Sequence, residues 1–460
     1  MMPAGIRGGL GYETSSGGQK LGLYLLLFFT FMSFSRVGDF AFPYLHLPFV
    51  SSTAALAICV LTRGIERSMQ TRVGAMLLAL TFWMLMGLPF SVWKGGSWET
   101  FTDKWIKSLL AYFLVAGLVI TVRDARKVMT TIALSSVIIV VLAQAFKQIG
   151  PDGRLYVAGQ STLSNPNDCA QLLLVGLPFL YLIMITSNTV ARVLAFLSIP
   201  AVMYTISATG SRGALLASLS VAAVIFWNAS PSNKVKGIAA SIFLMGLLVV
   251  TVPGQLKDRY STIFSKDASN AMDQMALDSK EERWFLLKQS VRLSLTHPLF
   301  GVGLGMFAVA SGDDAASLGM RAPWRETHNT YTQVSSETGL PAFALYMGAL
   351  AYCFSLMTRL KRASKNQPRF QLLFKMATCM HLSLLSFAVT SFFSSVAWSH
   401  YLPSLLGLTV ALYQAGRYEM GIAGVNVEAM AMPRILTPGR SKPAVKTPQG
   451  VPALAPMRRA

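Results

Sequence analysis

The sequence is poor in charged residues. Only 13% of its 460 residues are charged, whereas 53% are hydrophobic. Soluble domains typically carry about twice that share of charged residues. This composition excludes an ordinary soluble enzyme.

Acidic residues are especially scarce, with 20 Asp and Glu against 40 Lys and Arg. None of them lies inside the long apolar runs described below. Ion-coupled transporters usually place ionisable groups inside the membrane, so this absence argues against coupled transport. The formal net charge of +20 is typical of nucleic-acid binders, but no aromatic residues alternate with the basic ones as single-strand binding requires. We therefore expect no nucleic-acid partner.

Residues that bind metals or form disulfides are also few. The four cysteines, at positions 59, 169, 353 and 379, match no zinc, redox or secreted disulfide pattern. All four lie in or beside apolar runs, so we expect free, buried thiols. The histidines lack the spacing to acidic residues that a metal site needs. We predict no metal and no cofactor.

Long apolar runs make up most of the chain. A helix needs roughly 20 apolar residues to span the hydrocarbon core, and about twelve runs qualify. They predict an all-α, multi-pass membrane protein with about twelve transmembrane helices. The runs lie near residues 21–36, 43–61, 74–93, 105–122, 128–146, 169–187, 191–207, 213–229, 236–252, 340–358, 372–394 and 398–414. The first is no cleavable signal, because Phe34-Ser35-Arg36 offers no small-residue cleavage site.

The distribution of Lys and Arg predicts the orientation, with the N-terminus in the cytoplasm. Residues 1–20 form a cytoplasmic lead-in, and residues 21–252 hold about nine spans. Residues 253–339 form one large extracytoplasmic loop, which is nearly neutral and therefore suits translocation. Residues 340–414 hold about three more spans. Residues 415–460 form a disordered basic tail that anionic membrane lipids would attract.

The large loop contains a predicted amphipathic helix. Ser279 and Glu282 stand at the spacing of a capping box. Trp284, Val291 and Leu295 then follow at helical spacing and predict a helix over about 281–296, with its apolar face toward the bundle or the membrane surface. His297-Pro298 ends it, and a Gly-rich run over residues 301–305 follows.

Three polar pieces open on the same side of the membrane, because two spans separate each from the next. The first is the loop from Arg154 to Asp168, in which Asn167 or Asp168 could simply cap the next helix. The second is Arg212, which could reach the membrane interface or hold a phosphate together with the helix start. The third is the large loop, where His328 is followed by Glu337.

These pieces together resemble the bacterial O-antigen ligase and polymerase superfamily of membrane glycosyltransferases. The matching motifs are Ser211-Arg212-Gly213-Ala214, Arg283-Trp284, His297-Pro298 with the glycines up to Gly305, His328-Asn329 with Gly339 behind it, and the turn Asn165-Pro166-Asn167.

The resemblance implies a glycan donor on undecaprenyl diphosphate. The acceptor would be a hydroxyl of lipid A core, of another glycan or of another molecule, in lipopolysaccharide or related polysaccharide synthesis. It also implies an active site facing the periplasm in the bacterial inner membrane. On this hypothesis Arg212 and Arg283 clamp the diphosphate, and His328 activates the acceptor. The remaining candidates would bind substrate: Arg154, Asn165, Asn167, Arg321, Arg325, Asn329 and Glu337.

Other functions remain open on the sequence alone. A polysaccharide transporter or flippase, or a structural part of an export assembly, would share the multi-pass plan. Within the superfamily, the motifs do not separate a ligase from a polymerase or a protein-glycosylating relative. His328 by itself could be an ordinary loop histidine.

Overall fold

The structure is a computed structural model that describes residues 17–41, 43–159, 162–228, 231–232, 234, 271–317, 319 and 325–427. The apolar run predicted near 236–252, the candidate Arg321 and residues 428–460 of the predicted C-terminal tail lie outside these residues. Residues 415–422, predicted to be disordered tail, are helical.

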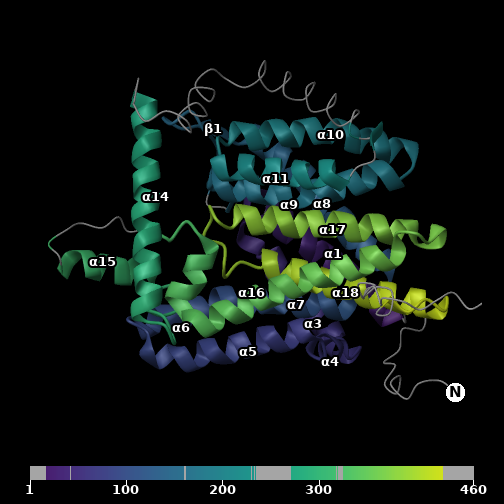
Figure 1. Cartoon of the computed structure of the whole chain (residues 1–460), viewed down its shortest axis with the longest axis horizontal. Helices are drawn as coiled ribbons and strands as arrows, with labels where there is room; N and C mark the ends of the chain where they lie inside the picture. The colour runs from purple at the N-terminus through teal and green to yellow at the C-terminus, as the bar shows by residue number, and fades with distance from the viewer. Residues whose placement is uncertain are drawn as a thin grey trace, which may run out of the picture.

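Long helices lie side by side in one bundle (Figure 1). In the first half of the chain they are α1 (Gly17–Ser35), α2 (Val37–Ala41), α3 (Leu47–Leu61), α4 (Gly64–Met69), α5 (Arg72–Gly87), α6 (Lys94–Thr100), α7 (Lys107–Leu118), α8 (Val122–Ala145), α9 (Pro166–Thr186), α10 (Thr189–Ala208) and α11 (Arg212–Asn228). In the second half they are α14 (Ala271–Thr296), α15 (Phe307–Ser317), α16 (Thr330–Ser364), α17 (Gln371–Thr390) and α18 (Tyr401–Ile422).

The described residues include one small sheet, in the connection between α8 and α9. Its strands β1 (Lys147–Ile149) and β2 (Leu155–Val157) pair antiparallel, with Gln148 opposite Tyr156. The tight turn between them brings Asp152 and Arg154 to the end of the bundle.

Among the residues that the structure describes, six helices are long and apolar enough to cross a membrane. They are the helical stretches Arg72–Phe90, Val122–Ala145, Pro166–Thr186, Thr189–Ala208, Thr330–Ser364 and Pro368–Thr390. Two shorter apolar helices, Leu47–Leu61 and Arg212–Trp227, fall below that length. The chain is therefore an all-α membrane protein, while the twelve-span count stays a prediction.

Local sequence explains why some predicted spans are short helices. The run near 43–61 begins with a 3-10 turn at Pro43, and only Leu47–Leu61 is α-helical. The run near 105–122 is divided between a π-helical segment, Phe101–Ile106, and the twelve-residue α7. In both places the apolar run is therefore longer than the continuous α-helix inside it.

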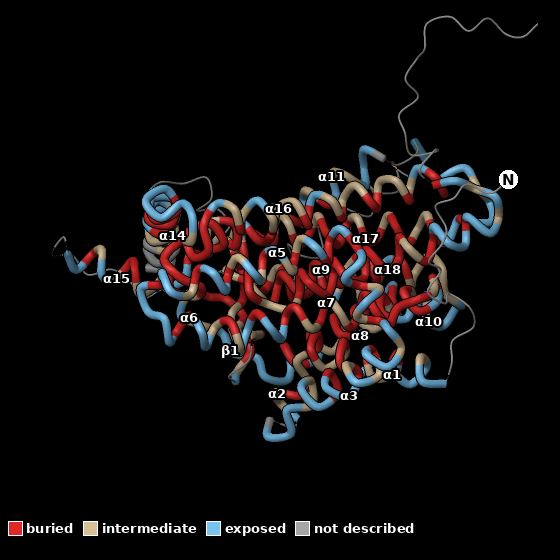
Figure 2. Tube along the Cα trace, turned by 90° about the horizontal axis from the view of Figure 1, so that it is seen from below, coloured by how far each residue is buried: buried red, intermediate tan, exposed pale blue. Residues whose placement is uncertain are grey.

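The interior of the bundle is closely packed, and buried residues run along the facing sides of the helices (Figure 2). Small residues let helices approach each other: a Cβ on Gly176 of α9 would lie 1.9 Å from Ser136 Oγ of α8. The four cysteines are free and buried, as predicted. Polar caps start several helices, as where Thr121 Oγ1 accepts a hydrogen bond from Asp124 N at the start of α8.

Helix α14 runs across one end of the bundle at a steep angle to the other helices (Figure 1). It begins at Ala271, so the predicted start near 281 was wrong. Ser279 lies inside the helix, where a Ser-x-x-Glu spacing does not mark a cap. The predicted end was right, because the helix stops at Thr296, before Pro298.

The predicted apolar face of α14 does not pack on the bundle. Trp284 is 58% exposed and Leu295 is 69% exposed. The buried face instead carries Leu286 and Leu293, which pack with Phe307 of α15. Ser294 joins α14 to α16 through a hydrogen bond to Ser335, with 2.8 Å between the hydroxyl oxygens.

Candidate functional site

The polar pieces singled out in the sequence meet at the end of the bundle where α14 crosses it (Figure 1). The β1–β2 turn, the start of α11 and the segment before α16 all lie there. This agrees with the same-side arrangement predicted by counting spans.

A cavity of about 610 Å³ lies among these pieces. We call it the arginine cavity, because Arg154, Arg283 and Arg325 line it together with His328. Asn165 and Asn167 also line it. Six predicted site residues from three separate stretches of sequence therefore share one cavity. Two carboxylates, of Asp152 and Glu282, complete its charged residues among those described.

Arg154 is buried and holds the wall of the arginine cavity together. Its Nε donates to the carbonyl oxygen of Thr209 at 2.7 Å. One of its terminal nitrogens donates to Asn167 Oδ1 at 2.8 Å. Arg154 thus ties the β1–β2 turn to the start of α9 and the end of α10. A guanidinium fixed by two such bonds is a preorganised positive charge.

Asn165, rather than Asn167 or Asp168, caps α9. Its side-chain oxygen accepts a hydrogen bond from Asn167 N at 3.0 Å. Pro166 then occupies the first helical position, where its fixed φ suits a helix start. The expectation that Asn167 or Asp168 caps this helix was wrong, because Asn167 Oδ1 is engaged by Arg154 instead.

His328 lies in a strained turn directly before α16. Its φ of 51° is in the left-handed region, which few residues other than glycine adopt. Ser395 Oγ accepts a hydrogen bond from His328 N at 2.8 Å. Thr330 Oγ1 donates to the carbonyl oxygen of Ser394 at 2.7 Å. The segment between α17 and α18 therefore fixes the His328 turn from outside its own stretch of sequence.

The surroundings of His328 favour the neutral imidazole. Burial, followed by the positive charges of Arg283, Arg325 and Arg154, lowers the pKa of His328 from 6.5 to about 4. At pH 7 the ring is therefore unprotonated and can accept a proton. Arg325 also pairs with Glu282 of α14, with 2.6 Å between Nε and Oε1, which joins the His328 segment to that helix.

Arg212 is not among the described residues that line the arginine cavity. It opens α11 and lies three residues after Thr209, whose carbonyl Arg154 engages. The structure thus brings Arg283 and His328 together and leaves Arg212 beside the wall.

Asn329 and Glu337 are used within the fold. Asn329 caps α16, its Oδ1 accepting from Tyr331 N at 2.9 Å and from Thr332 N at 3.2 Å. Glu337 is buried, and its Oε2 accepts from Gly305 N at 2.8 Å and from Trp398 Nε1 at 2.6 Å. Both substrate-binding roles remain predictions, and neither residue lines the described part of the arginine cavity.

The glycine motifs lock α16 to the end of α14. Val302 N donates to the carbonyl oxygen of Ser336 at 2.8 Å, and Gly303 N donates to that of Glu337 at 3.0 Å. Gly339 has a φ of 84°, and a Cβ there would lie 1.9 Å from the carbonyl oxygen of Leu299. The glycines over 301–305 therefore contact protein backbone in this structure.

Residues 193–347 match the sequence model of the family described as O-antigen ligase. This stretch contains Arg212, Arg283, His328 and Gly339. This match confirms the resemblance to the O-antigen ligase and polymerase superfamily over residues 193–347. No curated protein matches the chain in the comparison. The match supports a membrane protein that processes glycans, and an enzyme role in general.

The sequence analysis missed several residues that line or support the arginine cavity. Tyr156 and Ser164 line it, and the guanidinium carbon of Arg154 lies 6.0 Å from the centre of the Tyr156 ring. Ser395, which holds His328, stands 67 residues further along the chain. No local pattern could have found these contacts, because they depend on how distant segments fold together. The described residues contain no group of three or more His, Cys, Asp or Glu able to hold a metal ion.

Proposed function

We propose that this protein transfers a glycan from undecaprenyl diphosphate to an acceptor hydroxyl. The observation that carries the proposal is the arginine cavity, in which Arg154, Arg283 and Arg325 surround a neutral His328. On this proposal the cavity faces the periplasm, and the helices cross the bacterial inner membrane. The product is lipopolysaccharide or another surface polysaccharide.

The chemistry is an in-line displacement at the anomeric carbon of the donor sugar. The acceptor oxygen forms a bond to that carbon as the bond to the diphosphate oxygen breaks. The acceptor proton passes to His328, and the diphosphate leaves with the bonding electrons. Arginine suits the leaving group, because its planar fork of donors matches phosphate oxygens. Neutral His suits the acceptor, because it can take a proton at pH 7.

Arg283 is the main candidate for binding the diphosphate, since it lines the cavity and its charge acts on His328. Arg325 and Arg154, which line the same cavity, would add further positive charge for the diphosphate. Arg212 would act from the start of α11, where the positive end of the helix also favours an anion.

The test is to express His328→Ala and Arg283→Ala separately in a deletion strain and to examine surface glycan and lipid-linked intermediates on gels. Arg212→Ala tests the predicted role of that arginine. His297→Ala and Arg192→Ala are matched controls, because both residues are exposed and line neither cavity described here. We expect loss of product in the first two variants and normal product in both controls.

The same gels separate the two activities of the superfamily. Accumulation of long lipid-linked chains, with loss of capped core lipid, would identify a ligase. Single lipid-linked repeat units alone would identify a polymerase. Normal glycan in all site variants, at normal membrane levels, would contradict the proposal and favour a transport or structural role.

The proposal needs no metal. The arginine side chains supply the positive charge that a divalent cation would otherwise bring to the leaving diphosphate. We expect the purified protein to keep its transfer rate in excess chelator. Loss of activity on chelation, restored by a divalent cation, would remove this part of the proposal.

A further inference from the structure

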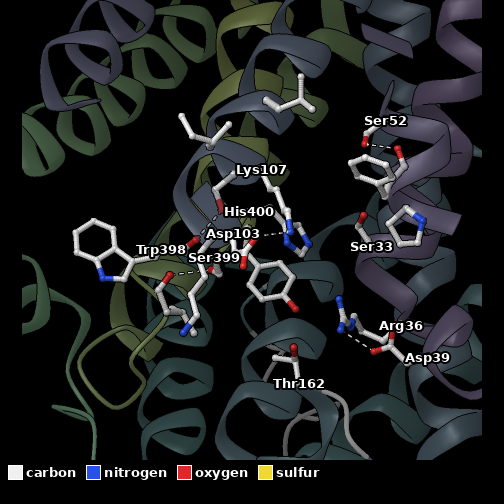
Figure 3. Close-up of a pocket in the computed structure, with 18 of the residues that line it drawn as sticks. Ser33, Arg36, Asp39, Ser52, Asp103, Lys107, Thr162, Trp398, Ser399 and His400 are labelled. Atoms are coloured by element: carbon white, nitrogen blue, oxygen red, sulfur yellow. Dashed lines mark hydrogen bonds and ion pairs between the residues drawn. The ribbon is translucent and has the colours of Figure 1, made fainter. Parts of the chain in front are cut away.

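A second cavity, of about 1120 Å³, lies at the same end of the bundle, where α1 ends and α3 and α18 begin. Figure 3 shows part of its lining. The cavity lies against the other side of the His328 turn. Glu326 and Ser395 line the second cavity, whereas Arg325 and His328 line the arginine cavity. Ser395 Oγ accepts the hydrogen bond from His328 N. The two cavities therefore share this turn as part of their walls.

The charges around the second cavity differ from those of the arginine cavity. Two of its cations are paired with neighbouring carboxylates: Arg36 lies 2.6 Å from Asp39, and Lys107 lies 3.1 Å from Asp103. Figure 3 shows both pairs on the wall. Lys104, Asp168 and Glu326 also line it, so four carboxylates face three cations among the described lining residues. Such a wall does not favour a diphosphate.

The buried polar atoms without a hydrogen-bond partner among the described residues include Oδ1 of Asp168 and Nε2 of His400, and both residues line this cavity. Leaving a buried polar atom unpaired costs free energy, so native proteins seldom do it without a reason. A ligand with many hydroxyl groups suits the side chains of Asp168 and His400, because a hydroxyl can donate to a carboxylate and either donate to or accept from an imidazole.

Part of the remaining wall suits a polyhydroxylated ligand as well, while another part is apolar, with Phe29, Phe49 and Leu110 among its residues. Hydroxyl groups of Ser33, Thr162 and Ser399 line it from three different parts of the chain. Trp398 also lines it, but this residue is 3% exposed and its Nε1 donates to Glu337 at 2.6 Å, so its side chain supports the wall.

We propose that the second cavity binds the glycan part of a substrate, beside the arginine cavity that takes the diphosphate. This inference rests on the proposed function, and it assigns the sugar and the phosphate to separate walls of one site. The bound glycan belongs either to the donor or to the acceptor, since the reacting groups of both must lie beside His328 and the second cavity borders the His328 turn.

The direct test measures binding to the purified full-length protein with two probes. One is undecaprenyl diphosphate without sugar, and the other is the glycan released by mild acid from the lipid-linked pool of the host strain. Asp168→Asn and Glu326→Gln remove a carboxylate with little change in shape. Each is expected to weaken glycan binding roughly tenfold, because hydrogen bonds to charged groups are the stronger ones. Binding of undecaprenyl diphosphate should not change.

The controls are Asp314→Asn and Glu99→Gln, which make the same chemical changes at residues that line neither cavity. Should Asp168→Asn fail to fold, Glu326→Gln alone decides. Equal weakening of both probes would mean that the second cavity holds the lipid diphosphate, which would overturn the inference. Unchanged glycan binding in a folded variant would overturn it too.

Transfer kinetics identify the source of the glycan. A raised KM for the donor alone assigns the cavity to the donor glycan, and a raised KM for the acceptor alone assigns it to the acceptor. Either result supports the inference. Normal KM values for both substrates would contradict it while leaving the proposed function intact. Conversely, full transfer by His328→Ala and Arg283→Ala would contradict the proposed function, whatever the glycan binding.

Discussion

At the scale of residues, the arginine cavity contains cations from three stretches of sequence and one histidine, which burial and these cations keep neutral. Arg154, Arg283, Arg325 and His328 were all predicted, because the family resemblance singled out Arg283 and His328 and because counting spans placed the polar segments on one side. Ser395 could not be predicted, since its hydrogen bond to His328 depends on the path of the segment between α17 and α18. Arg212 fits the family motif but lies beside the cavity wall.

The lowered pKa of His328 predicts the pH dependence of transfer. If neutral His328 is the base, kcat/KM should fall on the acid side near pH 4 rather than near 6.5. Arg283→Gln removes one positive charge, which should raise the pKa of His328 and move the acid-side fall of the residual activity to a higher pH. Burial is the largest cause of the lowered pKa and remains in this variant, so the midpoint of that fall should stay below pH 6.5. Asp152, Glu282, Arg154 and Arg325 still line the cavity in that variant.

The measurement is the pH profile of transfer by wild type, Arg283→Gln and the control Arg192→Gln. An acid limb at the ordinary histidine value, unmoved by Arg283→Gln, would contradict the assigned environment of His328.

Glu337 offers a choice between a structural role and the predicted substrate-binding role. Glu337→Ala leaves Gly305 N and Trp398 Nε1 without their acceptor, at a cost of about 1–3 kcal/mol for each unpaired group. We expect a clearly lower Tm in detergent, whereas the exposed control Glu99→Ala should change stability by less than about 0.5 kcal/mol. Unchanged thermal stability together with weaker substrate binding would favour the substrate-binding role instead.

At the scale of elements, the end of α14 was readable in the sequence and its start was not. Pro298 prevents the helix from continuing, which is a strong local constraint. The Ser-x-x-Glu spacing at Ser279 is only a weak constraint, because the same residues can also lie inside a continuous helix, as they do here. The glycine motifs were recognised by resemblance, but their contact with α16 required the structure.

Gly339 is expected to be the least tolerant glycine of this contact. Gly339→Ala would place a Cβ 1.9 Å from the carbonyl oxygen of Leu299, at a φ of 84° that alanine disfavours. We predict destabilisation of about 2–4 kcal/mol, a range typical of backbone strain and steric overlap. Gly348→Ala in the same helix is the control, because its nearest neighbour would be Met76 Sδ at 3.8 Å.

The readout for this pair is thermal unfolding in detergent. Gly348→Ala should be neutral or stabilising by up to about 1 kcal/mol, since alanine favours a helix more than glycine does. Equal stability of the two variants would show that the contact between α16 and the 298–305 segment is absent.

At the scale of the whole molecule, the apolar runs predicted the fold class and the side on which the polar segments meet. They overestimated the length of some continuous α-helices, because an apolar run does not reveal where a π-helical segment such as Phe101–Ile106 interrupts the α-helix. In the described part of the chain, six helices have the length and composition of a membrane span. Both cavities lie at one end of the bundle, so substrates with lipid anchors would approach from one face of the membrane.

Cysteine labelling tests this arrangement, because the four native cysteines are buried and should give little background. Lys147→Cys and Thr296→Cys place thiols at exposed positions beside the arginine cavity's end. Glu66→Cys and Asn366→Cys place them at the opposite end. A membrane-impermeant maleimide applied to spheroplasts should label the first pair only. Labelling of the second pair only would reverse the orientation, and a mixed pattern would contradict the bundle.

The most direct test of the central claim is the transfer rate of purified His328→Ala with a lipid-linked glycan donor and its acceptor. If His328 acts as the base, kcat should fall by about 10²–10⁴-fold, the usual contribution of general base catalysis. The control His297→Ala should stay within about twofold of wild type. A folded His328→Ala protein that transfers glycan at the wild-type rate would show that the chemistry does not depend on this histidine.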